Sequence, residues 1–204
     1  MKLVTKNDVI CTLGSCFAIE LKNEFSQRGF TILPNIESRN DAMVWYNTYS
    51  IRYEFERAFE DLSLNYEDCW ESPMGWQEPS RRFVFAENID DLRKISEGLD
   101  KDIGDGISNS NVYIITLGLS EAWKHSNSGR IICAHPNYGM RRYNVVGNEL
   151  TEFYNITEEE NLQNLRKICN LIDEFNPTAS IIFTVSPIPL IRTFTNESLE
   201  LANE

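Results

Sequence analysis

A serine and a cysteine stand side by side at Ser15 and Cys16, directly after Gly14. The preceding residues, 9–13, form a short apolar run with β-branched side chains, which is typical of a buried parallel strand. Residues 18–29 alternate apolar and charged side chains at helical spacing. The hydroxyl and the thiol are therefore predicted on a tight strand-to-helix turn, where α/β sheets bind their ligands.

The predicted position of this pair suits nucleophilic chemistry. A helix N-terminus offers free backbone N–H groups and the positive end of the helix dipole, which stabilise a thiolate or an oxyanion. Cys16 is therefore a candidate nucleophile, and the alternative is a buried cysteine that packs the turn. Ser15 is the competing nucleophile, although serine is also a preferred N-cap and can contact the oxyanion instead.

Four segments of the chain resemble the GSCFA-domain family. Residues 14–18 read Gly-Ser-Cys-Phe-Ala, the motif that names the family. The other segments follow in the family's order: Trp-Tyr-Asn-Thr-Tyr at 45–49, Ile-Ile-Thr-Leu-Gly-Leu-Ser-Glu-Ala-Trp at 114–123 and Phe-Thr-Val-Ser-Pro-Ile-Pro at 183–189. The family is similar to the SGNH/GDSL hydrolases, so the resemblance implies a flavodoxin-like α/β fold and ester or acyl chemistry.

The resemblance also implies roles for individual residues. Cys16 takes the place of the nucleophilic serine in the hydrolases' Gly-Asp-Ser motif. Residues 118–121, Gly-Leu-Ser-Glu, take the place of their Gly-x-Asn-Asp motif, so Ser120 replaces the oxyanion-binding asparagine and can donate one hydrogen bond. Ser120 or Glu121 can instead end the strand or cap a helix, and Asn47 is either a third oxyanion donor or an N-cap.

The chain has two histidines, His125 and His135, that could serve as a general base. His125 follows Ser120 by five residues and is expected at the rim of the pocket, where Glu121 could orient it. Each histidine can also be a surface or structural residue. SGNH hydrolases carry a late Asp-x-x-His motif, which these 204 residues lack. Either the chain is truncated, another pair replaces the motif, or no such pair exists.

Composition narrows the partners and cofactors. The net charge of −12 argues against nucleic acid and anionic membranes. No run approaches the ~20 apolar residues of a membrane span, and no signal peptide is recognisable. The odd number of dispersed cysteines, five, favours reduced thiols and a cytoplasmic location over a disulfide framework. No metal-ligand cluster or glycine-rich nucleotide motif occurs, so neither a metal nor a cofactor is expected.

The remaining pattern predicts one α/β domain over residues 1–204. Strands are expected at 9–13, 29–34, 112–117 and 179–185, and helices at 18–29, 51–62, 88–103 and 157–175. Residues 63–86 are expected to form an irregular, aromatic excursion, residues 104–111 a turn-rich connector, and residues 129–134 a short hairpin. The order of elements implies a parallel sheet with helices on both faces.

These observations together predict an SGNH-type, flavodoxin-like three-layer sandwich whose last strand and C-terminal catalytic segment are not recognisable in these residues. The expected activity is that of an esterase or acyltransferase on a carbohydrate-like or small acyl substrate, through Cys16 or Ser15. The alternatives are a catalytically inactive binding module and a component of polysaccharide biosynthesis that binds an acyl donor. An active thiolate would favour the enzyme, and ligand binding unchanged by Cys16→Ala would favour the module.

Overall fold

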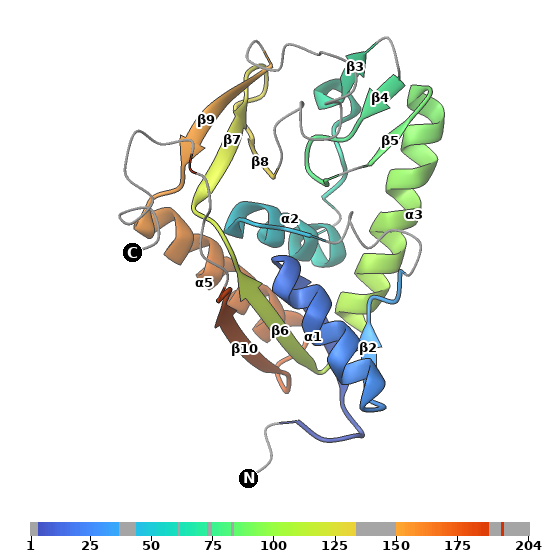
Figure 1. The fold of residues 1–204 in the computed structure, drawn as a ribbon, viewed down its shortest axis with the longest axis vertical. Helices are drawn as coiled ribbons and strands as arrows, with labels where there is room; N and C mark the ends of the chain where they lie inside the picture. The colour runs from blue at the N-terminus through green and yellow to red at the C-terminus, as the bar shows by residue number, and fades with distance from the viewer. Residues whose placement is uncertain are drawn as a thin grey trace.

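The central element of the computed structural model is a sheet of four parallel strands (Figure 1). The structure describes residues 4–36, 44–60, 62–72, 75–82, 84–133, 150–187 and 193. The strands of this sheet are β1 (Val9–Gly14), β2 (Thr31–Leu33), β6 (Val112–Leu117) and β10 (Ser180–Val185). Their order is β10-β6-β1-β2, so β6 and β1 occupy the interior. The predicted parallel sheet is therefore confirmed.

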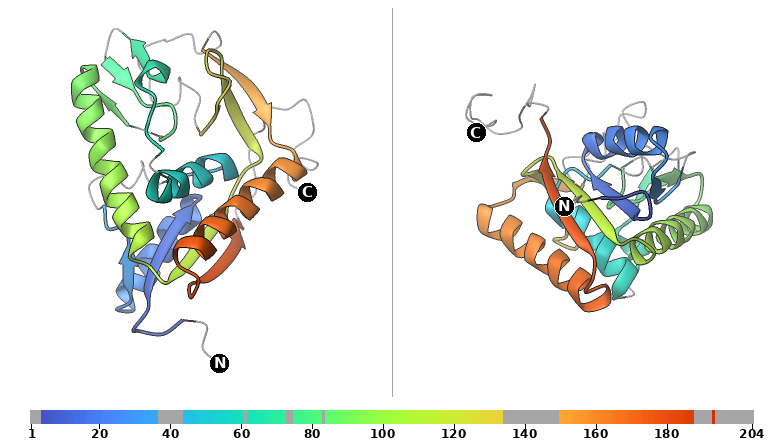
Figure 2. Two further views of the ribbon diagram at one scale, coloured as in Figure 1. Left: turned by 180° about the vertical axis from the view of Figure 1, so that it is seen from behind. Right: turned by 90° about the horizontal axis from the view of Figure 1, so that it is seen from below.

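Helices cover both faces of the sheet (Figure 2). On one face lies α1 (Cys16–Gln27), whose Leu21 and Phe25 pack against Ile10 and Ile114. The other face is covered by α2 (Thr48–Phe59), α3 (Ile89–Ser108) and α5 (Glu158–Phe175). This arrangement is a three-layer α/β fold that is compatible with a flavodoxin-like layout.

Strand β6 shows why the sequence pattern of the central strands is continuously apolar. Val112 and Ile114 belong to the core beneath α1, whereas Tyr113 and Ile115 belong to the core beneath the other helices. Successive side chains of a strand point to opposite faces, so a strand covered on both sides must be apolar at every position. The prediction of a buried, central strand at residues 112–117 is confirmed.

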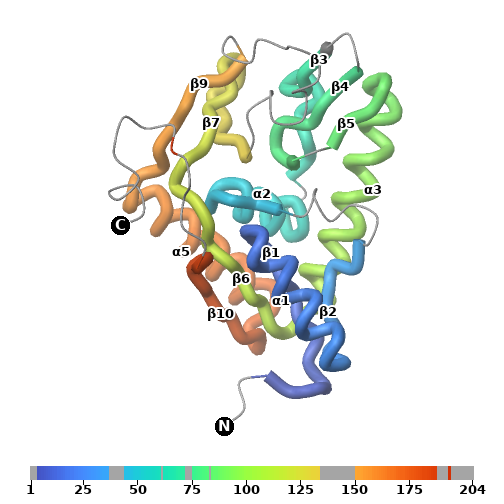
Figure 3. The backbone as a smooth tube through the Cα atoms, viewed as in Figure 1, coloured from blue at the N-terminus to red at the C-terminus, as the bar shows by residue number. Residues whose placement is uncertain are grey.

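Two smaller antiparallel sheets lie beyond the carboxyl ends of the central strands (Figure 1). The first contains β3 (Trp70–Ser72), β4 (Gly75–Gln77) and β5 (Phe85–Ala86), preceded by a 3-10 turn, η2 (Tyr66–Asp68). The second contains β7 (Glu121–His125), β8 (Ile131–Ile132) and β9 (Thr151–Asn155). β7 continues from β6 away from the central sheet (Figure 3).

Within residues 63–86, which were expected to be irregular, three short strands form the sheet β3-β4-β5. These strands have two or three residues each, which is too short for an alternating pattern to be visible in the sequence. The hairpin predicted at 129–134 has different bounds, since β7 pairs with β8.

Helix boundaries differ most from expectation at α3. The helix continues to Ser108, through the predicted connector at 104–111. A Cβ atom on Gly106 would lie 3.0 Å from the Cα of Pro34. The glycine therefore allows the helix to approach the end of β2 closely and does not mark a turn. By contrast, the capping box predicted at Thr157 is present at the start of α5.

None of the helices in the described ranges is both long and apolar enough to span a bilayer.

Candidate functional site

The four motif segments of the sequence meet at the carboxyl edge of the central sheet. Four backbone hydrogen bonds join them to one another: Ser15 N to Thr116 O (3.0 Å), Trp45 N to Gly14 O (2.8 Å), Leu119 N to Tyr46 O (2.7 Å) and Ser186 N to Leu117 O (2.8 Å). Backbone bonds hold the segments in one rigid arrangement. Side chains that are distant in the sequence are thereby positioned around the Gly-Ser-Cys turn.

Gly14 lets the β1–α1 turn lie directly against β6. Its φ angle is +128°, a backbone conformation that favours glycine. A Cβ atom at this position would lie 2.1 Å from the carbonyl oxygen of Thr116. Glycine is therefore required both by the backbone conformation and by the contact with the neighbouring strand.

Ser15 occupies the N-cap position of α1, but its hydroxyl does not cap the helix. The Ser15 Oγ lies 3.2 Å from Thr116 Oγ1, and the residue is only 1% exposed. The prediction of a capping hydroxyl is therefore wrong, because the side chain turns towards β6. Two consequences follow: the hydroxyl is shielded from solvent, and the first N–H groups of α1 have no side-chain cap.

Cys16 is the first residue of α1 and is partly exposed, with a free thiol. It thus stands at the uncapped, positive end of the helix dipole. Cys11, on β1, is by contrast buried in the main core, where burial raises the pKa of its thiol. All five cysteines are free thiols in the structure.

Tyr46 and Arg82 form a hydrogen-bonded pair beside Cys16, and the sequence did not single out either of them. Arg82 Nη1 donates to Tyr46 Oη at 2.9 Å, and the guanidinium carbon lies 5.5 Å from the centre of the tyrosine ring. Burial raises the pKa of Tyr46, Arg82 opposes this shift, and the Cys16 and Cys133 thiols add to it. The sequence pointed to Tyr46 only through its place in the second motif segment. It gave no indication of Arg82, which lies in the segment 63–86 that was expected to be irregular.

Asn47 is the N-cap of α2, which confirms one of the two roles predicted for it. Its Oδ1 accepts hydrogen bonds from the backbone N–H of Ser50 (2.9 Å) and from the Ser50 hydroxyl (3.0 Å). Its Nδ2 donates to the carbonyl oxygen of Ile132 at 3.4 Å, and the residue is 1% exposed. Both ends of the amide are therefore engaged in holding α2 and β8.

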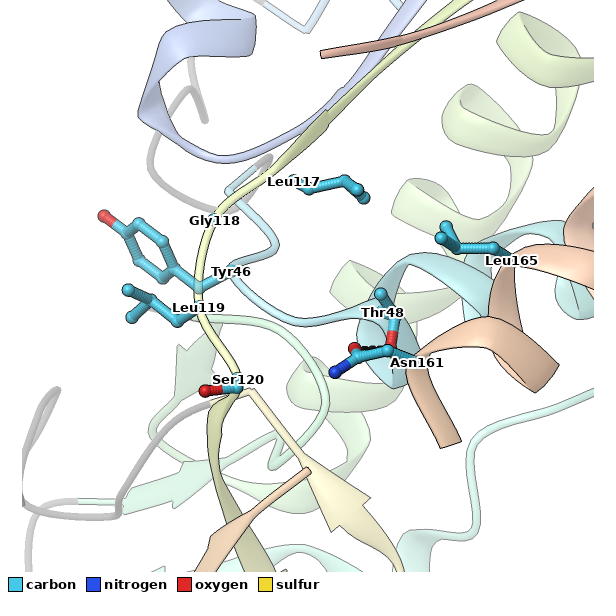
Figure 4. Close-up of a pocket in the computed structure, with 8 residues that line it drawn as sticks. All are labelled: Tyr46, Thr48, Leu117, Gly118, Leu119, Ser120, Asn161 and Leu165. Atoms are coloured by element: carbon cyan, nitrogen blue, oxygen red, sulfur yellow. Dashed lines mark hydrogen bonds between the residues drawn. The ribbon is translucent and has the colours of Figure 1, made fainter. Parts of the chain in front are cut away.

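A cavity of about 190 Å³ opens beside the third motif segment (Figure 4). Eight residues line it: Tyr46, Thr48, Leu117, Gly118, Leu119, Ser120, Asn161 and Leu165. In Figure 4 the Tyr46 ring and the Ser120 hydroxyl project to one side of the chain at 118–120, and Thr48 and Asn161 lie on the other. Ser120 is exposed, so its hydroxyl is available to a ligand.

The polar side of this cavity is held in place by α5. The Thr48 hydroxyl donates to Asn161 Oδ1 at 2.8 Å and accepts from Asn164 Nδ2 at 2.9 Å. Arg52 Nη1 in turn donates to Asn164 Oδ1 at 2.7 Å. Thr48 belongs to the second motif segment, but the sequence did not indicate its partners Asn161 and Asn164, which lie more than 100 positions away on α5.

His125 lies at the far end of β7 from Ser120, so the structure does not bring it to the pocket rim as expected. Five steps along the strand, at about 3.3 Å per residue, separate the two positions. The ring is 3% exposed, its Nε2 lies 3.0 Å from Asp68 O, and it stacks on Trp70 with ring centres 5.8 Å apart. These contacts are those of a structural histidine between the two small sheets.

The two remaining candidates for acid–base chemistry are Glu121 and His135, and the structure describes only the first of them. Glu121 begins β7 and accepts a hydrogen bond from the Thr193 hydroxyl. His135 lies outside the described residues. Within the described ranges, no group of three or more His, Cys, Asp or Glu side chains could hold a metal ion.

The fold and the site together define an α/β protein with a candidate thiol nucleophile at the carboxyl edge of a parallel sheet. The chain matches the GSCFA family over residues 9–200 and belongs to that family. The resemblance predicted from the four motif segments is thereby confirmed. The chain matches no curated protein and no solved structure.

Proposed function

We propose that this chain is an SGNH-like enzyme that hydrolyses an ester or transfers an acyl group, with Cys16 as the nucleophile. One observation carries the proposal: the partly exposed Cys16 thiol stands at the uncapped N-terminus of α1, at the ligand-binding edge of the sheet. The neighbouring Ser15 hydroxyl is buried against Thr116, which favours the thiol over the hydroxyl.

In this mechanism the Cys16 sulfur attacks the acyl carbon of the substrate. The carbonyl electron pair moves to oxygen, and the helix N-terminus and the Ser120 hydroxyl stabilise the resulting oxyanion. Collapse breaks the bond to the alcohol, which leaves with the proton that the Cys16 thiol has given up, and a thioester remains on Cys16. Attack by water or a second hydroxyl then releases the acyl group and restores the thiol.

The cavity beside residues 118–120 supports a small substrate. Its volume of about 190 Å³ suits a short acyl chain or part of a sugar ring. Leu117 and Leu165 provide apolar contacts, and Thr48 and Asn161 provide hydrogen-bonding groups. We therefore propose a carbohydrate-like or small acyl substrate. We also propose a cytoplasmic location, which the five free thiols support.

The test compares wild type with Cys16→Ala and Ser15→Ala, and with Cys169→Ala as a matched control on α5. One measurement is the burst of p-nitrophenol released from p-nitrophenyl acetate. The other is the pH dependence of alkylation by iodoacetamide, followed at the Cys16 peptide by mass spectrometry. We expect a burst that only Cys16→Ala abolishes, and alkylation with a pKa below the ~8.5 of a free cysteine.

Two results would contradict the proposal. A burst lost in Ser15→Ala but kept in Cys16→Ala would make Ser15 the nucleophile. An absent burst in wild type, together with an unreactive Cys16, would exclude the thiol enzyme.

A second candidate is a binding module that retains the fold without catalysis. It is favoured by one observation: among the described residues, no hydrogen bond joins the Cys16 thiol to a histidine or a carboxylate. In that case the chain would bind p-nitrophenyl acetate or a related acyl compound without a burst. Isothermal titration would then show the same affinity in wild type and in Cys16→Ala.

A further inference from the structure

We infer that the Tyr46 hydroxyl is a catalytic oxyanion donor in the acyl reaction at Cys16, and that Arg82 is the positioning residue that orients it. The inference rests on the proposed function, since an oxyanion forms only if acyl transfer occurs. It assigns roles to two residues that the sequence motifs did not distinguish. It also assigns to Tyr46 the oxyanion contact that the sequence suggested for Asn47, whose amide makes structural hydrogen bonds instead.

The direction of the hydrogen bond leaves the tyrosine proton available. A guanidinium group can only donate, so Tyr46 Oη is the acceptor in its 2.9 Å bond with Arg82 Nη1. The phenolic O–H is thus not used in this bond and can donate to another atom. A hydrogen bond from a charged donor also polarises the phenol, which strengthens the hydrogen bond that the phenol itself donates.

Tyr46 is held between the two turns that the reaction needs. The N–H of the preceding residue, Trp45, donates to Gly14 O on the Gly-Ser-Cys turn, and the Tyr46 carbonyl accepts from Leu119 N. Gly118 makes room for this approach, because a Cβ there would lie 3.0 Å from Tyr46 O and 3.5 Å from its Cδ1. The hydroxyl is therefore placed before substrate arrives, as effective oxyanion stabilisation requires.

The environment of Tyr46 also favours the protonated form that can donate. Burial raises the pKa of Tyr46, and the nearby Cys16 and Cys133 thiols act in the same direction against Arg82. The phenol consequently remains neutral at neutral pH. Figure 4 shows its ring on the same side of residues 118–120 as the Ser120 hydroxyl.

The neighbouring Asn47 side chain is less suited to this role, because it is only 1% exposed and both ends of its amide make structural bonds. Asn47 uses its Oδ1 for the cap of α2 and its Nδ2 for Ile132 O. Tyr46, one residue earlier in the same motif, has a hydroxyl that no such structural bond consumes. The oxyanion role that the sequence suggested for Asn47 therefore moves by one residue.

The experiment compares two reactions of the same thiol in wild type and Tyr46→Phe. Acylation by p-nitrophenyl acetate passes through an oxyanion, and nitrophenolate then leaves as an anion without needing a proton. Alkylation of Cys16 by iodoacetamide displaces iodide and forms no oxyanion. We expect Tyr46→Phe to slow the acylation burst by about 10²-fold, the effect of losing one oxyanion donor, and to leave the alkylation rate within twofold.

Two further variants sharpen the comparison. Arg82→Met should slow acylation by roughly tenfold without changing alkylation, because the phenol remains but is no longer oriented. Tyr154→Phe is the matched control, since its hydroxyl donates to Glu160 on α5 and it should leave both rates unchanged. A circular dichroism spectrum and urea unfolding midpoint equal to those of wild type show that each variant remains folded.

Three other results would contradict the inference, and each identifies a different error. If Cys16→Ala abolishes the burst but Tyr46→Phe keeps it, the proposed function holds and the role of Tyr46 is wrong. If Tyr46→Phe slows both reactions equally, the tyrosine acts on the thiol and not on an oxyanion. If wild type alkylates normally at Cys16 but shows no burst, the proposed function fails, and the inference fails with it.

Discussion

At the scale of single residues, Gly14 combines two structural requirements at the start of the site. Its φ of +128° is strained for any residue with a side chain, and Thr116 O leaves no room for a Cβ atom. Gly98 on α3 is the opposite case: it is exposed, and a Cβ there would meet nothing within 4 Å. The two glycines are thus a matched pair for substitution.

We expect Gly14→Ala to lower the free energy of unfolding by about 3 kcal/mol or more, through backbone strain and the clash with β6. Gly98→Ala should raise it by about 0.5–1 kcal/mol, because alanine favours the helix interior. Urea unfolding followed by circular dichroism measures both changes. A Gly14→Ala protein as stable as wild type would show that the turn does not need glycine.

At the scale of elements, a buried ionic network ties α2 to α3 and to the segment at 78–82. Arg81, fully buried, contacts Glu54 Oε2 at 2.5 Å and Asp100 Oδ1 at 2.7 Å. Arg57 joins Glu54 to Glu78, with both distances at 3.3 Å. Glu54 also accepts from Trp45 Nε1 at 2.9 Å, which connects the network to the motif segment that carries Tyr46.

Removing one partner of this network should be costly. We expect Glu54→Ala to lower the free energy of unfolding by about 3–5 kcal/mol, because it leaves Arg81 charged and buried. Glu24→Ala, which breaks an exposed pair with Arg28, should cost less than about 1 kcal/mol. Urea unfolding of both variants measures the difference, and equal effects would contradict the role assigned to burial.

The same network predicts a pH dependence. Burial opposes ionisation of Glu54, but Arg81 and Arg57 outweigh it, so its pKa lies below the ordinary 4.5. A lowered pKa in the folded state stabilises the protein above pH 4.5, and this contribution is lost as the pH falls towards the folded-state value. The stability difference between wild type and Glu54→Ala, measured by urea unfolding from pH 7 downwards, should therefore narrow below pH 4.5. A constant difference would show that Glu54 is not ionised in the folded protein.

At the scale of the whole molecule, the central sheet and the sheet β3-β4-β5 differ in how well their buried polar groups are satisfied. In the part of the chain that the structure describes, buried atoms without a hydrogen-bond partner include Trp70 Nε1 on β3 and both polar atoms of the Gln77 side chain on β4, whereas Thr184 Oγ1 on β10 is the one such atom on the central sheet. Each such group costs about 1–3 kcal/mol. The small sheet is therefore expected to open before the central sheet unfolds.

Native-state hydrogen exchange tests this order. Amides of β3 and β4 should exchange with an opening free energy at least about 2 kcal/mol below that of amides in β1 and β6. The central amides should exchange only through global unfolding, because β6 is buried on both faces. Equal opening free energies in the two sheets would show that the molecule unfolds as one unit.

Local patterns in the sequence determined the central strands, the capping box of α5 and the strand-to-helix turn at residues 14–16. These features depend on residues that are close along the chain: an apolar run is buried on both faces, and Thr157 and Glu160 cap one helix turn. The family followed from the same short segments.

Only the tertiary structure decided which side chains meet at the site. The Ser15 hydroxyl turns to Thr116, His125 stacks on Trp70, and Arg82 reaches Tyr46 across 36 positions of sequence. A polar side chain can cap, pair or bind a ligand with the same local sequence around it. The choice depends on which distant partner the fold brings within hydrogen-bond distance, and sequence periodicity carries no information about that distance.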